Sequence, residues 1–161
     1  MRIIFALLLI STVAVAGKAP LFNGDLLGGG RLSLKKTFEK QKGVLVCFWA
    51  SWCTPCLEEL KNLTDAFKSS QKPDFDVITV NVDTPDTSSD VNPTVRFYGF
   101  SFPVVLDPKQ DIFAKYHQER TLPFSVLLSQ TGDILQTFTG HQDDFISQIQ
   151  NALSALNGSG L

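Results

Sequence analysis

Two cysteines separated by two residues carry the clearest chemical signal in this 161-residue chain, in the run Trp52-Cys53-Thr54-Pro55-Cys56. Thiol–disulfide exchange needs one accessible thiolate and a second thiol that resolves the mixed disulfide. A bridge that encloses only two residues removes little chain entropy from the unfolded state, so stabilisation of the fold explains the pair poorly. The pair therefore predicts redox chemistry, with Cys53 as the nucleophile and Cys56 as the resolving thiol.

A metal site and a passive bridge are the structural alternatives for this pair. A zinc site would need a second pair of ligands. The remaining cysteine is Cys47, and the two histidines, His117 and His141, lie far along the chain. We therefore expect no metal ion and no other cofactor.

The third cysteine, Cys47, lies six residues before Cys53 in an apolar run. A free cysteine in a core strand usually behaves as a small hydrophobic residue. A second possibility stays open, in which Cys47 exchanges with Cys56 under oxidative stress.

The patterns on either side of the motif predict the elements that position it. Residues 44–49 form a continuous β-prone apolar run, which indicates a strand buried on both faces. A helix is predicted from about residue 54 to 69, with one apolar stripe at Leu57, Leu60, Leu63, Ala66 and Phe67. Cys53 then stands at the helix start, where unpaired N–H groups and the positive end of the helix dipole stabilise a thiolate.

The other segments complete an alternating pattern of strands and helices. Strands are predicted at residues 75–82, at 103–106 as an edge strand or extended segment, and at 124–128 and 134–138 as a hairpin. Helices are predicted at 33–40, 93–98, 112–117 and 142–156, and residues 19–30 indicate a turn-rich leader and hairpin. A strand–helix–strand unit normally gives parallel neighbours with a right-handed crossover.

Length and charge limit the classes of function. The length suits one domain with a real core, and the chain is 43% hydrophobic and 19% charged, which is an ordinary globular balance. The formal net charge is −2 and no cluster of lysines and arginines is present, which argues against nucleic-acid binding.

The N-terminal residues have the layout of a secretory signal. Arg2 is followed by an apolar stretch at residues 3–16 with small residues at Ala14 and Ala16, which predicts cleavage after Ala16. An uncleaved membrane anchor is the main alternative, although the stretch is shorter than the roughly 20 apolar residues that span a bilayer comfortably. A buried N-terminal strand or helix is the third reading. We expect an extracytoplasmic, periplasmic protein.

The segment from Val44 to Cys56, VLVCFWASWCTPC, resembles the core signature of the thioredoxin superfamily. The wider pattern resembles the TlpA/ResA-like (CcmG/DsbE-like) branch of extracytoplasmic thiol–disulfide oxidoreductases, which includes the exported reductases of cytochrome c maturation. Residues 102–108 match the segment that this branch inserts before its conserved proline, and Thr121-Leu122-Pro123 matches that proline.

This resemblance implies an α/β thioredoxin fold with a central mixed β-sheet flanked by helices. It further implies an N-terminal β-hairpin extension and a strand/helix insertion before the cis-proline. We expect a signal peptide at residues 1–16, a thioredoxin-like domain at 17–157 and a flexible tail at 158–161.

The resemblance also implies roles for residues around the cysteines. Pro123 is expected to be cis and to face the Cys53 sulfur, since a cis-proline leaves neighbouring backbone groups free to pair with an extended substrate chain. The residues expected to bind substrate are Trp52, Thr54, Pro55, Leu122 and Pro123.

Glu59 lies where ResA-like proteins carry an active-site glutamate. A carboxylate near two sulfurs could shuttle a proton between thiol and thiolate, and would raise the thiol pKa values by like-charge repulsion. The alternative is a solvated helix glutamate like its neighbour Glu58. Cys47 stands where other thioredoxins carry a buried acid, so proton transfer here is expected to use Glu59 or water.

The residues between the cysteines indicate the direction of electron transfer. Thr54 and Pro55 bring no positive charge, and no lysine or arginine lies immediately beside Cys53. A thiolate without special stabilisation makes the reduced form less favoured, so we expect a reductase of partner disulfides. By analogy with the branch, the expected partners are apocytochrome c and a membrane thiol-reductant donor, and we expect a monomer.

Other functions stay open on the sequence alone. They are a general periplasmic reductase, a redox sensor, a disulfide oxidant or isomerase, and a non-enzymatic module that docks partners in the cis-proline groove. A thiol peroxidase is disfavoured, because it would need a threonine two or three residues before its cysteine in a proline-rich loop, where Ser51 and Trp52 stand.

Overall fold

The computed structural model describes residues 17–38, 43–68 and 75–158, with side chains up to residue 155. Within these residues, seven strands form one mixed sheet in the order β2-β1-β5-β4-β3-β6-β7. The strands are β1 (Asn23–Leu26), β2 (Arg31–Ser33), β3 (Gly43–Trp49), β4 (Asp76–Asn81), β5 (Val104–Leu106), β6 (Phe124–Ser129) and β7 (Ile134–Thr139). The helices are α1 (Leu34–Thr37), α2 (Thr54–Lys68), the 3-10 turn η1 (Ser88–Asp90), α3 (Val91–Tyr98), α4 (Asp111–Tyr116) and α5 (Phe145–Gly158).

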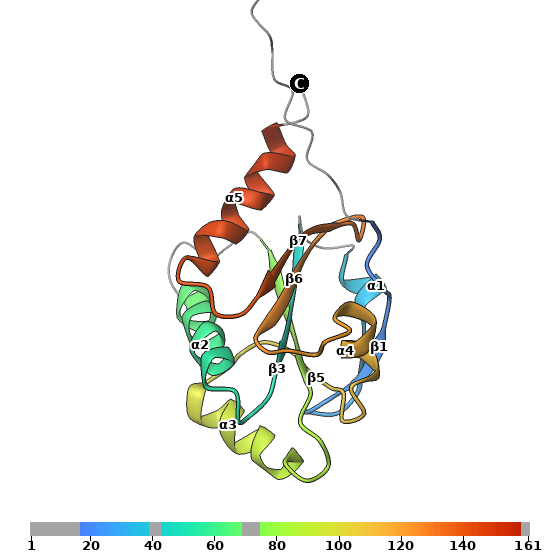
Figure 1. Cartoon of the computed structure of the whole chain (residues 1–161), viewed down its shortest axis with the longest axis vertical. Helices are drawn as coiled ribbons and strands as arrows, with labels where there is room; N and C mark the ends of the chain where they lie inside the picture. The colour runs from blue at the N-terminus through green and yellow to red at the C-terminus, as the bar shows by residue number, and fades with distance from the viewer. Residues whose placement is uncertain (1–16, 39–42, 69–74, 159–161) are drawn as a thin grey trace, which may run out of the picture.

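Helices cover both faces of the sheet. Figure 1 shows α2, α3 and α5 along one face and α1 and α4 along the other. β3 lies at the centre, parallel to β4 and antiparallel to β6, and all seven of its residues are buried. A strand covered on both faces needs no polar side chains, which explains its continuous apolar sequence. The predicted α/β fold, with a central mixed sheet and flanking helices, is confirmed.

The N-terminal hairpin extends the sheet beyond β5, so the expectation of an edge strand at residues 103–106 is wrong. β4 pairs with one side of β5 in parallel, and β1 pairs with the other side in antiparallel register, Asp25 opposite Leu106 and Leu26 opposite Val105. Gly24 permits this close approach, because a Cβ atom there would stand 2.2 Å from Val105 Cγ1. The hairpin therefore covers the strand that would otherwise be exposed.

Most predicted elements are present, and their ends differ by a few residues. α1 ends at Thr37, earlier than predicted, and Ser33 stands at its N-cap without a side-chain capping hydrogen bond. α5 begins at Phe145 rather than at Gln142 and reaches Gly158, so the first residue of the predicted tail is helical. Gln142 instead belongs to the loop between β7 and α5, where its backbone contacts α2.

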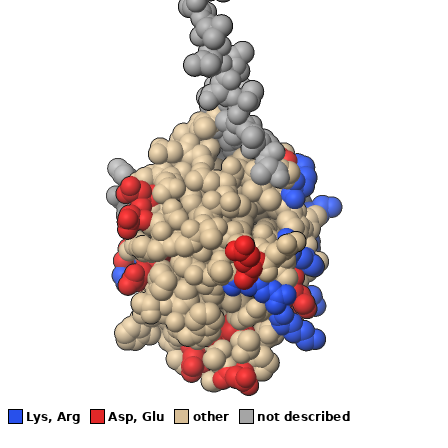
Figure 2. All heavy atoms as spheres, in the orientation of Figure 1, with Lys and Arg blue, Asp and Glu red and all other residues tan. Residues whose placement is uncertain are grey.

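Figure 2 shows where charged side chains lie on one face of the molecule. Lysines and arginines gather along the side of α1 and α4 with a few acidic side chains among them, and other acidic side chains lie in the middle of the face, on the opposite side and at the end near α3. Most of the surface between them is uncharged. This face therefore carries no continuous basic surface.

The predicted signal at residues 1–16 lies outside the described residues. Within the described part of the chain, no helix is both long enough and apolar enough to cross a membrane.

Candidate active site

Cys53 and Cys56 form a disulfide at the junction between β3 and α2, with their Cα atoms 5.3 Å apart. The Leu57 N–H donates to the Cys53 carbonyl oxygen at 3.1 Å, so Cys53 occupies the N-cap of α2. The first N–H groups of a helix have no partner within it and point toward this position. The placement of Cys53 at the helix start is therefore confirmed, and a thiolate formed there faces the positive end of α2.

The two cysteines differ little in exposure while they are bridged. Cys53 is 5% exposed and Cys56 is 2% exposed. The adjacent Trp52 side chain is 62% exposed. The expected difference in access between nucleophile and resolving thiol is thus small in the oxidised form, and the two roles stay a prediction based on position at the helix start.

A buried carboxylate that the sequence analysis did not select holds the loop before Cys53. Asp83 is 2% exposed. Its carboxylate accepts hydrogen bonds from the Ser51 N–H at 2.7 Å, from Ser51 Oγ at 2.6 Å and from Asn81 Nδ2 at 2.7 Å. The available signal was its place directly after a buried strand, because the carboxyl ends of the parallel strands β3 and β4 lie side by side. Asp83 therefore fixes the backbone that presents Trp52 and Cys53.

The peptide bond between Leu122 and Pro123 is cis, as predicted. Pro123 lines a small cavity together with Cys56, and its carbonyl oxygen accepts a hydrogen bond from the Gly140 N–H at 2.9 Å. The fold thus brings the cis-proline to the second cysteine across more than 60 residues of sequence. Its orientation toward the Cys53 sulfur stays a prediction.

A histidine packs against the segment that carries the cis-proline. The His117 ring stacks on Phe124, with ring centroids 4.4 Å apart, and its Nε2 lies 2.7 Å from Thr121 Oγ1. These contacts flank Leu122 and Pro123 on both sides in sequence. The sequence analysis considered His117 only as a metal ligand and missed this structural role.

Glu59 is buried, whereas Glu58 beside it is exposed. The Gln142 N–H donates to Glu59 Oε1 at 2.9 Å, and His141 Nδ1 lies 3.5 Å from the same oxygen. Burial raises the pKa of Glu59, and the Gln142 hydrogen bond and the His141 charge offset only part of that rise. The alternative of a solvated helix glutamate is therefore wrong for Glu59.

Cys47 lies beside this carboxylate at the centre of the sheet. It is 3% exposed. The pKa of its thiol is raised to about 12, because burial and, to a smaller extent, the negative charge of Glu59 raise it more than a hydrogen bond with Ser125 lowers it. A thiol with such a pKa stays protonated at neutral pH and is a poor nucleophile. The structure therefore favours the reading of Cys47 as a small core residue.

A cavity of about 10 Å³ joins these groups, which is room for about one water molecule. Its polar lining comes from three elements, and its residues include Cys47, Cys56, Glu59, Pro123 and Ser125. The carboxylate in this lining is that of Glu59 from α2. The β3 residue in the lining is Cys47, which carries a thiol. A single bridging water could connect Glu59 with the Cys56 sulfur.

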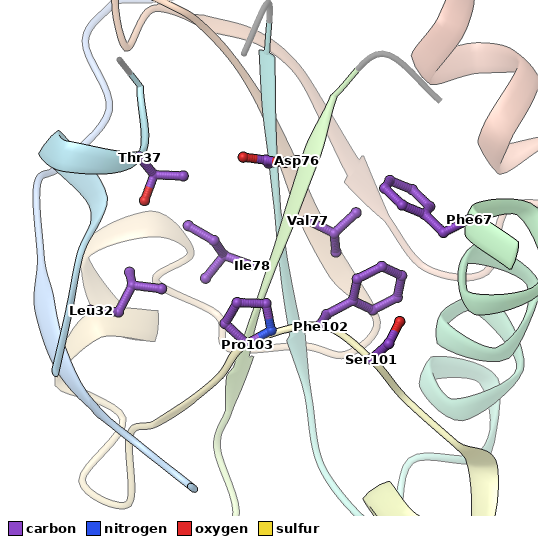
Figure 3. A pocket seen from close by; sticks show the side chains of 9 residues that line it. All are labelled: Leu32, Thr37, Phe67, Asp76, Val77, Ile78, Ser101, Phe102 and Pro103. Atoms are coloured by element: carbon purple, nitrogen blue, oxygen red, sulfur yellow. The ribbon is translucent and has the colours of Figure 1, made fainter. Parts of the chain in front are cut away.

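A larger cavity of about 380 Å³ lies away from the cysteines. In Figure 3, Phe67 and Phe102 stand on one side of it and Leu32 and Thr37 on the other. Asp76, at the start of β4, lines this cavity. Cys53 follows the carboxyl end of β3, which runs parallel to β4, so the two residues lie at opposite ends of this strand pair. The disulfide therefore does not belong to this cavity.

Among the described residues, no group of three or more histidine, cysteine, aspartate and glutamate side chains converges in a way that could hold a metal ion. The described site combines a disulfide-forming pair of sulfurs with a nearby buried carboxylate.

Comparison with known proteins places this site in a family. The model of the AhpC/TSA family matches residues 15–148. The thiol-disulfide oxidoreductase ResA of Bacillus thuringiensis is 30% identical over 128 residues, which cover 80% of this chain and 71% of ResA. ResA of Geobacillus kaustophilus is 31% identical over 130 residues, which cover 81% of this chain and 72% of that protein.

Solved structures agree with this assignment. StoA from Bacillus subtilis superposes with a TM-score of 0.62 and 28% identity, covering 83% of this chain and 96% of StoA. The thioredoxin domain of a thiol-disulfide oxidoreductase from Bacteroides vulgatus superposes with a TM-score of 0.68 at 23% identity, covering 90% and 99% of the two chains, and supports the fold.

The fold and the cysteine pair define a thioredoxin-fold thiol–disulfide oxidoreductase, so the class of enzyme predicted from the cysteines is confirmed. The chain belongs to the AhpC/TSA family, and its curated relatives place it with the ResA-like oxidoreductases.

Proposed function

We propose that this enzyme reduces disulfides of extracytoplasmic proteins through Cys53 and Cys56. The Cys53 thiolate attacks a substrate disulfide, and one substrate sulfur leaves as a thiolate. The Cys56 thiol then loses its proton and attacks the Cys53 sulfur, which forms the Cys53–Cys56 disulfide and releases the second substrate thiol. Two electrons pass to the substrate in each cycle, and a thiol-reductant donor returns the pair to its dithiol form.

The observation that carries this proposal is the Cys53–Cys56 disulfide at the N-terminus of α2, in the same site as a cis-proline. The direction of transfer is supported by the residues between the cysteines. Thr54 and Pro55 supply no cation to stabilise the thiolate. The dithiol form is therefore the less favoured one, and it gives its electrons to partners.

Glu59 is proposed to accept the proton that Cys56 releases. A general base works best when its pKa lies near the working pH, and burial moves the pKa of Glu59 upward in that direction. The one-water cavity between Glu59 and Cys56 gives the proton a path. Cys47 cannot take this role, because its thiol holds its own proton at neutral pH.

An extended substrate segment is proposed to bind across the rim formed by Trp52, Thr54, Pro55, Leu122 and Pro123. Support comes from the exposed Trp52 ring next to Cys53 and from the cis-proline segment, where Leu122 is half-buried. The backbone before a cis-proline can pair with an added strand, and an exposed aromatic ring supplies apolar contact area.

The proposed substrate is the Cys-x-x-Cys-His segment of apocytochrome c, and the proposed donor is a membrane thiol reductant. Both follow the resemblance to the cytochrome c maturation reductases. The proposed compartment is extracytoplasmic and is based on the predicted signal at residues 1–16. Residues 17–157 are the proposed domain that acts there. The proposed oligomeric state is a monomer.

Insulin reduction with dithiothreitol as donor tests the proposed reaction. Wild-type enzyme is expected to accelerate insulin precipitation, and Cys53→Ala is expected to abolish the acceleration. Cys56→Ala is expected to accumulate a mixed disulfide with a peptide that carries an oxidised Cys-x-x-Cys-His segment. A wild-type protein as inactive as Cys53→Ala would contradict the proposed reductase activity. The non-enzymatic binding module would then be the remaining alternative.

A further inference from the structure

His141 contacts Glu59, is far more exposed than it, and does not line the small cavity. Its Nδ1 is 3.5 Å from Glu59 Oε1, and its Nε2 is 3.7 Å from Asp143 Oδ1. The Glu59 side chain is 6% exposed, the His141 side chain 43% and the Asp143 side chain 99%. The exposed fraction therefore rises from Glu59 to His141 to Asp143, and these three side chains lead from the buried site to solvent.

The titratable groups that face Glu59 come from three elements. His141 approaches from the loop between β7 and α5, Cys47 from β3 and Cys56 from α2 itself. The loop also supplies the Gln142 N–H. Of these groups, imidazole is the one whose charge ordinarily changes between pH 5 and 8.

We propose that His141 carries protons between the buried Glu59 carboxyl group and solvent, and that its charge sets how readily Glu59 takes up a proton. The inference rests on the proposed role of Glu59. In this proposal His141 acts through its contact with Glu59, so it is a positioning residue.

When Cys56 attacks the Cys53 sulfur, the electron pair of the Cys56 thiolate forms the new S–S bond, and the thiol proton passes to the Glu59 carboxylate. Glu59 gives this proton to Nδ1 of neutral His141, and the imidazolium releases a proton from Nε2 toward solvent beside Asp143. One proton leaves the buried site and no electrons move through the relay. Reduction of the disulfide by the donor runs the same path in reverse.

The charge of His141 acts on Glu59 in a definite direction. An imidazolium 3.5 Å from Oε1 stabilises the carboxylate against the effect of burial. Without it, the Gln142 hydrogen bond is the remaining contact that favours the charged form. Glu59 would then hold its proton to higher pH, so at acidic pH less of it would be in the carboxylate form that accepts the Cys56 proton.

The test compares His141→Gln, Glu59→Gln and the double variant in the full enzyme. The pH dependence of insulin reduction is measured from pH 5 to 8, and the Glu59 carboxyl titration is followed by carbon-13 NMR. His141→Gln is expected to move the acid limb of the rate profile and the Glu59 titration upward by about one pH unit. In the Glu59→Gln background, His141→Gln is expected to change nothing further, since its effect passes through Glu59.

Two further variants complete the test. His141→Lys keeps a cation beside Glu59 and is expected to return the titration close to that of the wild type. Asp144→Asn removes an exposed charge from the same loop and is expected to move neither profile.

The proposal is overturned if His141→Gln shifts neither the acid limb of the rate profile nor the Glu59 titration. An equal effect of His141→Gln with and without the Glu59 carboxyl group would overturn it as well. The NMR titration needs no activity, so it separates this inference from the reductase proposal. An enzyme inactive on insulin in which the Glu59 titration still depends on His141 would refute the reductase proposal and support the His141–Glu59 link.

Discussion

The proposed proton acceptor of this site, Glu59, comes from a helix. Glu59 of α2 reaches the cavity beside Cys56, while the β3 position that faces it holds the neutral thiol of Cys47. The carboxylate is buried with one backbone hydrogen bond and one histidine contact. Burial destabilises its charged form and so raises the pKa of Glu59, which is the direction that the proposed role as a proton acceptor requires.

Glu59→Gln is expected to slow disulfide exchange by about 100-fold, because a general base contributes roughly 10²–10⁴ in rate. The same change is expected to raise the free energy of unfolding at pH 7.5. The pKa of Glu59 is higher in the folded than in the unfolded state, so the folded state binds more protons in that window, and stability falls as pH rises through it.

Urea denaturation of both proteins at pH 4.5 and 7.5, beside insulin reduction, checks this prediction. The gain in stability should be larger at pH 7.5 than at pH 4.5. Glu58→Gln is the matched control on the exposed neighbour and should change neither quantity. A Glu59→Gln enzyme with wild-type turnover would rule out the proton-acceptor role.

Cys47→Ala is expected to leave turnover within about twofold of wild type and to lower the free energy of unfolding by about 1 kcal/mol, since it removes one buried atom from a packed core. Turnover and mass spectra of peroxide-treated protein provide the check. A Cys47–Cys56 bridge in the wild type, together with slower recovery in Cys47→Ala, would instead favour Cys47 as a third redox cysteine.

Sequence and structure agree closely at the cysteines and diverge at their supporting side chains. The helix-start position of Cys53 and the cis-proline at Pro123 follow from local patterns and the family resemblance. Asp83 and His141 could not be selected in this way. Each acts through a contact with a residue more than 30 positions away, and in sequence each looks like an ordinary loop residue.

At the scale of elements, the loop between β3 and α2 depends on the end of β4. Asp83→Ala is expected to lower the free energy of unfolding by about 2–3 kcal/mol, because it leaves the Ser51 N–H and the Asn81 amide without their acceptor. It is also expected to slow insulin reduction, since the backbone that presents Cys53 loses its anchor. Chemical denaturation and turnover assays measure the two effects.

Asp86→Ala is the control for this prediction, because Asp86 is exposed in the same loop. Equal effects of the two substitutions would show that the loop responds to charge in general and that Asp83 is no specific anchor.

The N-terminal hairpin is the element whose place the sequence left open. Gly24→Ala is expected to lower the free energy of unfolding by about 1–3 kcal/mol, because the new Cβ meets Val105 at the contact between β1 and β5. The cysteine chemistry should remain intact. Gly28→Ala is the matched control, since a Cβ there meets nothing within 4 Å. Thermal unfolding of both variants distinguishes a packed hairpin from one that contributes little.

Whether a segment forms a helix or a strand was predictable, because apolar periodicity is a local property. The residues at which each element begins and ends were less predictable. Residues 103–106 were predicted as an edge strand because the local pattern gives no sign of their second partner. That partner, β1, lies about 80 residues earlier and contributes only two residue pairs. Residues 142–144 were predicted as the first turn of a helix because their polar side chains fit one. In the fold they precede the helix, which begins at Phe145, and the Gln142 N–H donates to Glu59.

At the scale of the whole molecule, the sheet brings distant segments to one end. The cysteines follow β3, Asp83 follows β4, the cis-proline precedes β6 and His141 follows β7. These strands are neighbours in the sheet, and their adjacent ends form the site. The site as a whole therefore depends on the order of the strands, which local sequence patterns do not determine.

We propose that this arrangement makes Cys53 and Cys56 a reducing couple. The most direct test is the reduction potential of the couple, measured by equilibration of the whole protein in dithiothreitol and glutathione buffers with alkylation of free thiols. A value near about −270 mV or below is predicted, which is the range of thioredoxin. A value near about −120 mV, the range of a strong oxidant, would contradict the account and reverse the direction of electron flow.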